Sequence, residues 1–351
     1  MKKIQETDNE KLFHQKILLR ADFNVSMEKG KVKEAFKIKS LQKTLDYLLE
    51  KKCQVAIASH FGRPEGKIKP EFSLNLIKNE AEKILEHKMI FVSDCVGEEV
   101  VKSFEKIDNG GEVLLLENVR FQKGEEENEE KFAQKLAENF DIFVNDAFSV
   151  SHRNHASVAG VTKFIPSYAG FQLQKEIEEM EKLKNNFAHP AIAIIGGAKI
   201  ETKVAVIDFF EKRYDFVLVG GKIANEALDQ KIIFSGKVVL PTDFVGDRLD
   251  IGEKTIKKFE EIISCAQTIV WNGPLGKFEE EKYARGTYQI LDFILEHLKD
   301  KKPYVVLGGG ETLEILEKRK AMERISFVST GGGAMLAYIG GEKMPGLESV
   351  I

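Results

Sequence analysis

Short apolar runs alternate with longer helix-forming segments along most of the chain, and this alternation constrains the fold more than any other feature. The runs are Ile17–Arg20, Val55–Ser59, Met89–Ser93, Val113–Glu117, Ile142–Asn145, Ala191–Gly196, Phe216–Gly220, Val238–Pro241, Thr268–Asn272, Tyr304–Gly308 and Ile325–Ser329. Near-continuous apolar strands separated by helices are typical of parallel sheets covered on both faces. The two sets of runs predict an α/β protein with two Rossmann-like parallel-sheet domains, which are joined by a helix and have a cleft between them.

A change of composition near residue 170 predicts the boundary between the domains. Pro166 and the small residues after it end the first set of runs, the segment Gln172–Leu183 is charged and helix-forming, and Asn185–Pro190 breaks it. The last residues are too few for another strand and helix, so we expect them to pack against an existing surface. The expected parts are residues 1–168, a connecting helix at 169–187, residues 188–336 and a C-terminal segment at 337–351.

Size and composition narrow the class of protein. A chain of 351 residues exceeds what one core usually supports, and 43% hydrophobic with 31% charged residues is ordinary for a globular protein. The net charge of −4 argues against a nucleic-acid or membrane-surface role. No apolar run reaches the roughly 18 residues of a membrane span. Three widely spaced cysteines and a start unlike a signal peptide predict a cytoplasmic location.

Charged residues follow the strands of the first half. Ligands bind beyond the carboxyl ends of parallel strands, so these residues are expected to lie together. Each one alone could be a surface or capping residue, but the set predicts an anion site, because arginine suits carboxylates and phosphates. The set comprises Arg20, Asp22, Asn24, His60, Arg63, Arg120, His152, Arg153 and His155.

Glycines follow the strands of the second half instead. Bare backbone N–H groups at helix starts, with Lys199 and Lys203 one helical turn apart, predict a site for a polyphosphate. Tight packing between helix and strand also needs glycine, but five clusters favour the binding site. The clusters are Gly196–Gly197, Gly220–Gly221, Gly273 with Gly276, Gly308–Gly310 before Glu311 and Thr312, and Gly331–Gly333.

The missing motifs exclude several enzyme classes. The sequence has no P-loop pattern, no dinucleotide fingerprint after the first strand, and no zinc-protease, nucleophile-elbow or paired-cysteine motif. A cationic site in one domain and a backbone phosphate site in the other match phosphoryl transfer, which needs positioning and charge neutralisation with Mg²⁺. The two domains would close to bring the reactants together. The residues therefore predict a two-domain kinase.

An ordered series of motifs resembles the phosphoglycerate kinase family over nearly the whole chain. The motifs are Arg20–Val25, Ser59–Pro64, Leu116–Phe121, Asn145–Phe148, His152–Ser157, Gly196–Lys199, Trp271–Gly276 and Ser329–Gly333. The resemblance implies reversible transfer of the acyl phosphate of 1,3-bisphosphoglycerate to ADP in glycolysis and gluconeogenesis, which gives 3-phosphoglycerate and ATP and uses Mg²⁺. These small molecules would be the partners of a monomer. The C-terminal segment would pack back on the first domain.

The resemblance also implies roles for single residues. The anion site would hold phosphoglycerate, with Lys37 at the position of a family arginine that supports the transferring group. Lys199 would steady that group and Gly331, Gly332 and Gly333 would supply amides to it. Residues expected to bind the nucleotide are Gly197, Lys199, Lys203, Gly220, Gly221, Gly276, Glu279 at the ribose, Gly309, Gly310, Glu311 and Thr312.

Four departures from the family pattern stand out. Lys37 keeps the charge of the family's arginine but loses its planar fork. Glu311 replaces an aspartate, so its longer side chain must bring the carboxylate to Mg²⁺. Lys222 stands where the family has a small residue beside the adenine. The stretch Leu228–Asp250 is short, and a helix and a loop expected there are missing.

Three functions remain in competition at this point. The leading hypothesis is an active phosphoglycerate kinase. The second is a weakened or inactive relative that binds nucleotide or phosphoglycerate, which Lys37, Glu311 and the short stretch favour and the intact lysines and arginines oppose. The third is another small-molecule kinase, which would need different polar groups near Asp22 and Asn24.

Overall fold

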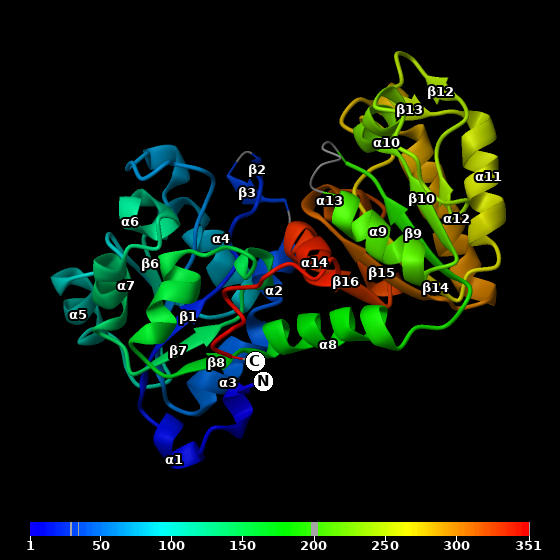
Figure 1. The fold of residues 1–351 in the computed structure, drawn as a ribbon. Coiled ribbons are helices and arrows are strands. Elements are labelled where there is room, and N and C mark those ends of the chain that lie inside the picture. Colours follow the sequence, from blue (N-terminus) through cyan, green and yellow to red (C-terminus); the bar gives the residue numbers. More distant parts are fainter. Residues whose placement is uncertain (29, 34, 198–202, 351) are drawn as a thin grey trace. The chain divides into compact units, whose positions relative to one another are not determined.

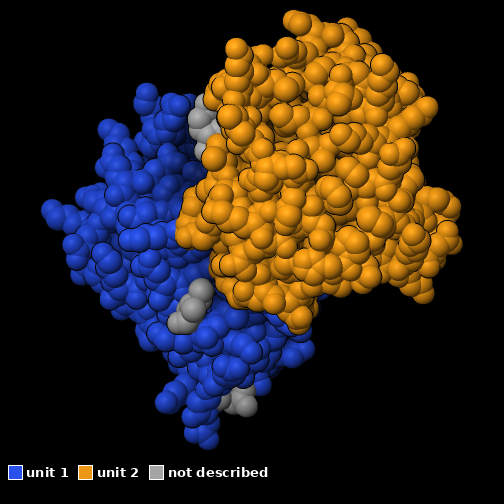
Figure 2. All heavy atoms as spheres, turned by 45° about the vertical axis from the view of Figure 1, so that its right-hand side comes forward, with its two compact units in different colours: residues 1–178, 343–351 blue, residues 179–342 orange. Residues whose placement is uncertain are grey.

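The computed structural model describes residues 1–28, 30–33, 35–197 and 203–350, and these form two compact units. Unit 1 contains residues 1–178 and 343–351, and unit 2 contains residues 179–342, as coloured in Figure 2. Helix α8 (Phe171–Asn185) runs from unit 1 into unit 2. No helix of the described residues is long and apolar enough to cross a membrane.

Unit 1 is built on a six-stranded parallel sheet in the order β5-β6-β4-β1-β7-β8 (Figure 1). The strands are β1 (Lys16–Arg20), β4 (Gln54–Ala58), β5 (Met89–Val92), β6 (Val113–Leu116), β7 (Ile142–Asn145) and β8 (Ser167–Ala169). The sequence predicts all of these except the last. Because β8 has only three residues, Ser167, Tyr168 and Ala169, its pattern does not differ from that of a loop.

Alternate residues of the unit 1 strands enter two separate cores, one on each face of the sheet. Leu19 and Ile57 pack with α3 (Gln42–Glu50) and α4 (Asn75–Leu85), whereas Leu18 and Ala56 pack with α5 (Glu98–Phe104) and α7 (Glu130–Ala137). Both faces are therefore covered, which explains why the strands are apolar throughout. The remaining elements are α1 (Asn9–Leu12), the hairpin of β2 (Met27–Glu28) and β3 (Lys31–Val32), α2 (Ala35–Lys39) and α6 (Lys123–Glu126).

Unit 2 has a second six-stranded parallel sheet, in the order β11-β10-β9-β14-β15-β16. Its strands are β9 (Ala191–Ile195), β10 (Phe216–Val219), β11 (Val238–Val239), β14 (Thr268–Asn272), β15 (Tyr304–Gly308) and β16 (Phe327–Ser329). Its helices are α9 (Val204–Arg213), α10 (Gly221–Asp229), α11 (Glu253–Ile263), α12 (Arg285–Asp300), α13 (Gly310–Lys318) and α14 (Gly332–Ile339). Two parallel-sheet α/β units confirm the predicted fold class.

The chain between α10 and α11 contains only short strands. After Gln230 it passes through β11, then through the antiparallel pair of β12 (Phe244–Val245) and β13 (Asp250–Ile251), before α11 begins at Glu253. This stretch is fully described and holds no helix. The short connection brings Arg248 and Leu249 directly to the edge of a pocket in unit 2.

Candidate active site

Parallel pairing gathers the charged residues of unit 1 at one edge of its sheet. Arg20, the last residue of β1, is the Cα partner of Ala58 in β4 and of Asn145 in β7. The residues that follow these strands therefore leave the sheet side by side. We call the cluster that results the basic site; it consists of Arg20, Asp22, Asn24, Lys37, His60, Arg120, His152, Arg153 and His155.

Arg20 is the buried base of the basic site and not part of its surface. Its side chain is 1% exposed, and its guanidinium donates from Nε to Ser157 Oγ (2.9 Å) and from Nη1 to the Ala21 carbonyl (2.5 Å). Ser157 in turn donates to Glu125 Oε1 (2.6 Å), and Glu125 is 0% exposed. Burial lowers the pKa of Arg20, and the nearby carboxylates of Glu125 and Asp22 oppose that shift. The sequence gives no signal for Glu125, which stands in a run of glutamates.

Arg120 is fixed by the loop after β6. The Asn118 side chain donates to the carbonyls of Phe61 (2.7 Å) and Phe72 (2.9 Å) and accepts from the Arg120 N–H (3.0 Å). Arg120 donates from Nη1 to the Gly62 carbonyl at 2.9 Å. Its Nε lies 3.2 Å from Glu126 Oε1. Burial lowers its pKa to about 10, with Glu126 opposing. The side chain stays positively charged at neutral pH.

Lys37 reaches the basic site from α2. Its Nζ donates to the Asn24 carbonyl at 3.0 Å, and the Asn24 side chain accepts from the Gly62 N–H at 2.9 Å. Asp22 accepts from the Asn24 N–H at 3.0 Å, so the turn after β1 is held in one shape. Lys37 thus supplies a cation near the positions that the sequence groups together. Arg63 is exposed.

The three histidines add hydrogen-bonding groups to the basic site but no positive charge at neutral pH. Burial, followed by the positive charges of Arg20, Arg120, Arg153 and Lys37, holds the pKa of His60 well below its usual range. Burial and neighbouring arginines lower the pKa of His155 to about 3. Burial and Arg153 lower that of His152 to about 4. From the sequence, these histidines are expected to add positive charge to the anion site. In the structure their lowered pKa values leave only the arginines and Lys37 as cations of the basic site.

In unit 2, Asn272 at the end of β14 connects the glycine-rich strand ends. It is the Cα partner of Gly308 in β15 and of Ile195 in β9. Its side chain accepts from Lys203 Nζ at 3.1 Å and donates to the Gly332 carbonyl at 3.2 Å. Beside it lies a cavity of about 330 Å³, which we call the glycine pocket; it is lined by Gly196, Gly197, Lys203, Asn272, Gly273, Gly309, Gly310, Glu311, Gly332 and Gly333.

The glycines of unit 2 serve two different purposes. A Cβ on Gly332 would lie 2.3 Å from the Gly309 Cα, and one on Gly196 would lie 2.0 Å from the Pro274 carbonyl oxygen, so close packing requires both. A Cβ on Gly310 or Gly333 would meet nothing within 4 Å. Gly310 and Gly333 therefore leave space beside the helix starts that a ligand can use. Tight packing thus accounts for Gly196 and Gly332, whereas a role in binding stays a prediction for Gly310 and Gly333.

Lys203 and Glu311 both line the glycine pocket, and the charge of each shifts the pKa of the other. Burial lowers the pKa of Lys203 to about 8, and the carboxylate of Glu311 opposes this shift. The pKa of Glu311 is raised by removal from water and then by Glu279, while Lys203 lowers it. An anion with a bound cation would satisfy both groups. Lys199 lies outside the described residues.

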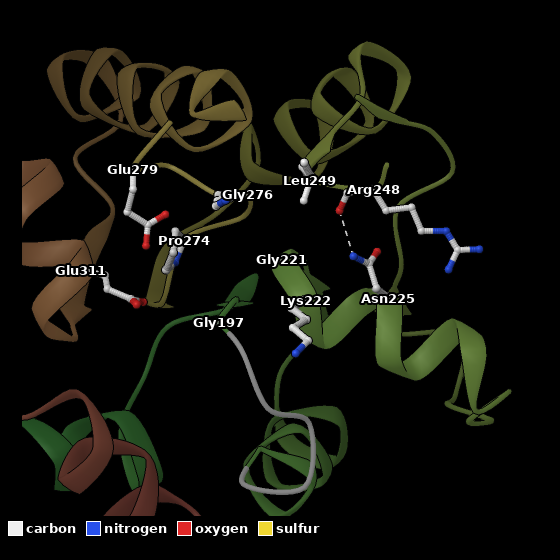
Figure 3. A pocket seen from close by; sticks show the side chains of 11 residues that line it. Gly197, Gly221, Lys222, Asn225, Arg248, Leu249, Pro274, Gly276, Glu279 and Glu311 are labelled. Carbon is white, nitrogen blue, oxygen red and sulfur yellow. Dashed lines mark hydrogen bonds between the residues drawn. The ribbon is translucent and has the colours of Figure 1, made fainter. Parts of the chain in front are cut away.

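A second cavity of about 230 Å³ adjoins the first, because Gly197 and Glu311 line both (Figure 3). We call it the side pocket; its other lining residues are Gly221, Lys222, Asn225, Arg248, Leu249, Pro274, Gly276, Lys277 and Glu279. Asn225 Nδ2 donates to the Arg248 carbonyl at 2.9 Å, which ties α10 to the short stretch before β13. Glu279 and Glu311 lie on the side of the pocket opposite Asn225.

Some residues expected to contact the nucleotide or the transferring group line neither cavity. Gly220 packs against Leu275, and Thr312 is 2% exposed and accepts from the Gly273 N–H at 3.1 Å. Gly331 precedes α14 and lines neither cavity. Conversely, the structure brings in Asn225, Arg248 and Leu249, which the sequence does not mark. They belong to a helix and a connection whose approach only the fold determines.

Two α/β units, one with an arginine-rich site and one with a glycine pocket beside the side pocket, match the arrangement expected of a small-molecule phosphotransferase. The family model "Phosphoglycerate kinase" matches residues 7–245 and 245–342. The chain belongs to the phosphoglycerate kinase family.

Curated relatives and solved structures agree with this assignment. The chain is 38% identical to the phosphoglycerate kinase of Bartonella henselae over 378 residues, covering 95% of each chain. It is 36% identical to that of Wolbachia pipientis, covering 97% of each. The crystal structure of the Pyrococcus horikoshii enzyme matches with a TM-score of 0.87 at 28% identity, covering 100% of this chain and 98% of that one.

The comparisons also bear on the shortened stretch. The alignment with the Bartonella protein runs over 378 residues, whereas this chain has 351, so the chain lacks segments that its relative has. The two segments matched by the family model meet at residue 245, within the stretch Leu228–Asp250. This supports a deletion at the connection that borders the side pocket.

A methyl group is expected to affect stability at Gly332, which is closely packed, and ligand binding at Gly310, which faces open space. Gly332→Ala should destabilise the protein by about 1–3 kcal/mol, because the Cβ overlaps backbone. Gly310→Ala should leave the free energy of unfolding within about 0.5 kcal/mol but weaken nucleotide binding, because the methyl group enters the glycine pocket. Urea unfolding and a nucleotide titration measure the two quantities. Equal stability losses in both variants would contradict this division.

The low pKa of His155 predicts a pH-dependent difference from His155→Gln. Below about pH 6.5 the unfolded histidine binds a proton, whereas the folded one does not until about pH 3. Wild-type stability should therefore fall relative to the variant as the pH drops from 6.5 to 4.5, by at most about 1.4 kcal/mol per pH unit. The comparison cancels the opposite contributions of Asp146 and Asp250, whose pKa values are raised by burial. If the free energies of unfolding of wild type and His155→Gln change with pH in parallel, His155 does not have a lowered pKa in the folded protein.

Proposed function

We propose that this chain is an active phosphoglycerate kinase, which transfers a phosphoryl group reversibly between 1,3-bisphosphoglycerate and ADP. The observation that carries the proposal is the basic site, in which Arg120 and Lys37 are held by hydrogen bonds to backbone carbonyls and Arg20 is held in place at its base. The family match, the relatives and the similar solved structure give no support for the alternative of a binding protein without turnover.

Unit 1 would bind phosphoglycerate. The permanent charges of Arg120, Arg153 and the exposed Arg63 suit its phosphate and carboxylate, and Asp22 and Asn24 offer hydrogen-bonding groups to its hydroxyl. The neutral rings of His60, His152 and His155 would complete the site, with Arg20 acting from below. Lys37 would neutralise charge that develops on the transferring group.

Unit 2 would bind ADP or ATP. The phosphates would occupy the glycine pocket, held by the N–H groups at the start of α13 (Gly309 and Gly310) and by Lys203. The base and ribose would occupy the side pocket, with Gly197, Gly221 and Gly276 at the base and Glu279 at the ribose hydroxyls. Gly220 and Thr312 would support these walls, and Lys199 and Gly331–Gly333 would approach the transferring group.

The residues around Glu311 fit a nucleotide-bound Mg²⁺. Among the described residues no group of three or more metal-binding side chains is present. A single carboxylate beside a phosphate pocket suits Mg²⁺, which is usually held by one or two carboxylates, phosphates and water. Bound there, the ion would neutralise charge on the phosphates. The raised pKa of Glu311 indicates a carboxylate that a nearby cation would stabilise.

In the reverse direction, a carboxylate oxygen of 3-phosphoglycerate attacks the γ-phosphorus of ATP. The new P–O bond forms the acyl phosphate of 1,3-bisphosphoglycerate, and the bond to the bridging oxygen breaks to release ADP. Negative charge spreads over the oxygens of the phosphoryl group during its transfer. Lys37, Lys199 and the amides of Gly331–Gly333 would stabilise this charge. We propose that the two units close on their substrates to bring these atoms together.

Three further expectations belong to this proposal. The domains would be residues 1–168 and 188–336, with the connecting helix at 169–187, and residues 337–351 would return to the first domain. The enzyme would be a monomer and act in the cytoplasm. It would use neither nucleic acid nor membrane as a partner.

A coupled assay with 3-phosphoglycerate, ATP and Mg²⁺ tests the proposed function. The purified protein should turn over both substrates, and leaving out either one should abolish the signal. A folded sample that binds ADP but shows no turnover would refute the proposal.

Replacing Lys203 separates the two substrates. Lys203→Ala should raise the KM for ATP roughly 10- to 100-fold, because hydrogen bonds to charged groups contribute about 1.5–3 kcal/mol, and should leave the KD for 3-phosphoglycerate nearly unchanged. Lys212→Ala is a suitable control, because Lys212 lies on α9 and pairs with Asp208 on the surface. Equal weakening of both substrates would contradict the division between the units.

Lys37→Arg tests the first departure from the family pattern. The guanidinium restores the planar fork at a position that already contacts the Asn24 carbonyl. Steady-state kinetics should show a kcat that is preserved or raised. A fall of more than about tenfold (roughly 1.4 kcal/mol) would show that Lys37 does not occupy the position of the family's arginine.

A further inference from the structure

A buried chain of hydrogen bonds leads from Glu125 through Ser157 and Arg20 to His60. Glu125 accepts from the Ser157 N–H (2.8 Å) and hydroxyl (2.6 Å). The hydroxyl oxygen accepts from Arg20 Nε at 2.9 Å, and Arg20 Nη2 lies 3.3 Å from His60 Nδ1. Glu125 and Arg20 are 0% and 1% exposed, so bulk water does not reach the groups that form these hydrogen bonds.

The chemistry of arginine decides the direction of the last hydrogen bond. A guanidinium has five N–H donors and no acceptor. His60 Nδ1 must therefore accept from Arg20, which requires a lone pair on Nδ1 and excludes the doubly protonated ring. The single ring proton then resides on Nε2. Burial and four nearby cations lower the pKa of His60 and so act in the same direction.

The opposite end of the chain holds Arg20 in this orientation. Its Nε is fixed by Ser157 and its Nη1 donates to the Ala21 carbonyl, so the guanidinium plane cannot turn away from His60. The Glu125 carboxylate balances its charge in the interior. Within the described residues, His60 Nε2 has no hydrogen-bond partner and is left for a ligand.

We propose that Arg20 is a positioning residue that acts through His60, by holding the imidazole as its Nε2–H tautomer. His60 then offers an uncharged donor to an oxygen of phosphoglycerate. The identity of that ligand rests on the proposed function, whereas the tautomer does not. An uncharged donor keeps its hydrogen bond across neutral pH, while the charge needed for the anion comes from the neighbouring arginines and Lys37.

Long-range ¹H–¹⁵N spectra of the histidine-labelled protein test the tautomer directly, with His60→Gln as the assignment variant. Between pH 6 and 8, His60 Nδ1 should resonate as an unprotonated and Nε2 as a protonated nitrogen. A proton on Nδ1, or a doubly protonated ring, would overturn the proposal even if the enzyme is active. The tautomer is measured in the wild-type chain, and His60→Gln serves only to assign its signals.

Two variants test whether Arg20 is the cause. Arg20→Met removes the donor, so His60 should become a mixture of tautomers. Ser157→Ala removes the Nε contact that fixes the guanidinium but keeps the Nη2 donor, so the share of the Nε2–H form should fall less than in Arg20→Met. An unchanged His60 spectrum in folded Arg20→Met would refute the role of Arg20, and so would a larger change in Ser157→Ala than in Arg20→Met.

Addition of 3-phosphoglycerate tests the ligand. The Nε2–H resonance of wild-type His60 should shift and its exchange with water should slow. If the enzyme is active but this resonance does not respond, the proposed contact is wrong. If the enzyme is inactive and the tautomer is as predicted, the proposed function fails while the role of Arg20 stands.

Discussion

The parallel pairing of β1 with β4 and β7, and of β14 with β9 and β15, places every strand end of a unit at one edge of its sheet. Residues far apart in sequence, such as Arg20, His60 and Arg120, therefore meet without any long loop to carry them. The same constraint brings Asn272 against Gly308 and Gly332. Both candidate sites depend on this geometry, because each is assembled from three or more strand ends.

The two candidate sites differ in the groups that they offer to an anion. The site in unit 1 offers side-chain charge. Arg20 is linked to Glu125 through Ser157, and Arg120 contacts the Gly62 carbonyl and Glu126. The site in unit 2 offers backbone N–H groups at helix starts together with the half-buried Lys203. Backbone N–H groups carry no net charge and need no counter-charge, so the glycine pocket needs no buried carboxylate. The buried arginines of the basic site do need one, and Glu125 supplies it to Arg20.

The sequence predicts the strands, the strand-end positions and the division of chemistry, because these follow from apolar patterning and residue type. It does not predict burial. Arg20, Arg120 and Arg63 look alike in sequence, yet the first two are buried and Arg63 is exposed. The histidines lose their charge because burial and then several nearby cations lower their pKa. Nor can it separate Gly332, which packing requires, from Gly310, which faces open space. Burial, charge and free space depend on neighbours from other strands. The positions of Asn225 and Arg248 at the side pocket depend on the fold in the same way.

The central claim is that each unit receives one substrate, and hydrogen–deuterium exchange tests it most directly. Addition of 3-phosphoglycerate alone should protect amides at the unit 1 strand ends, at residues 20–24, 59–63 and 118–121. Addition of ADP with Mg²⁺ alone should protect those of unit 2, at residues 308–312 and 329–333. Protection of the same unit by both ligands would contradict the account.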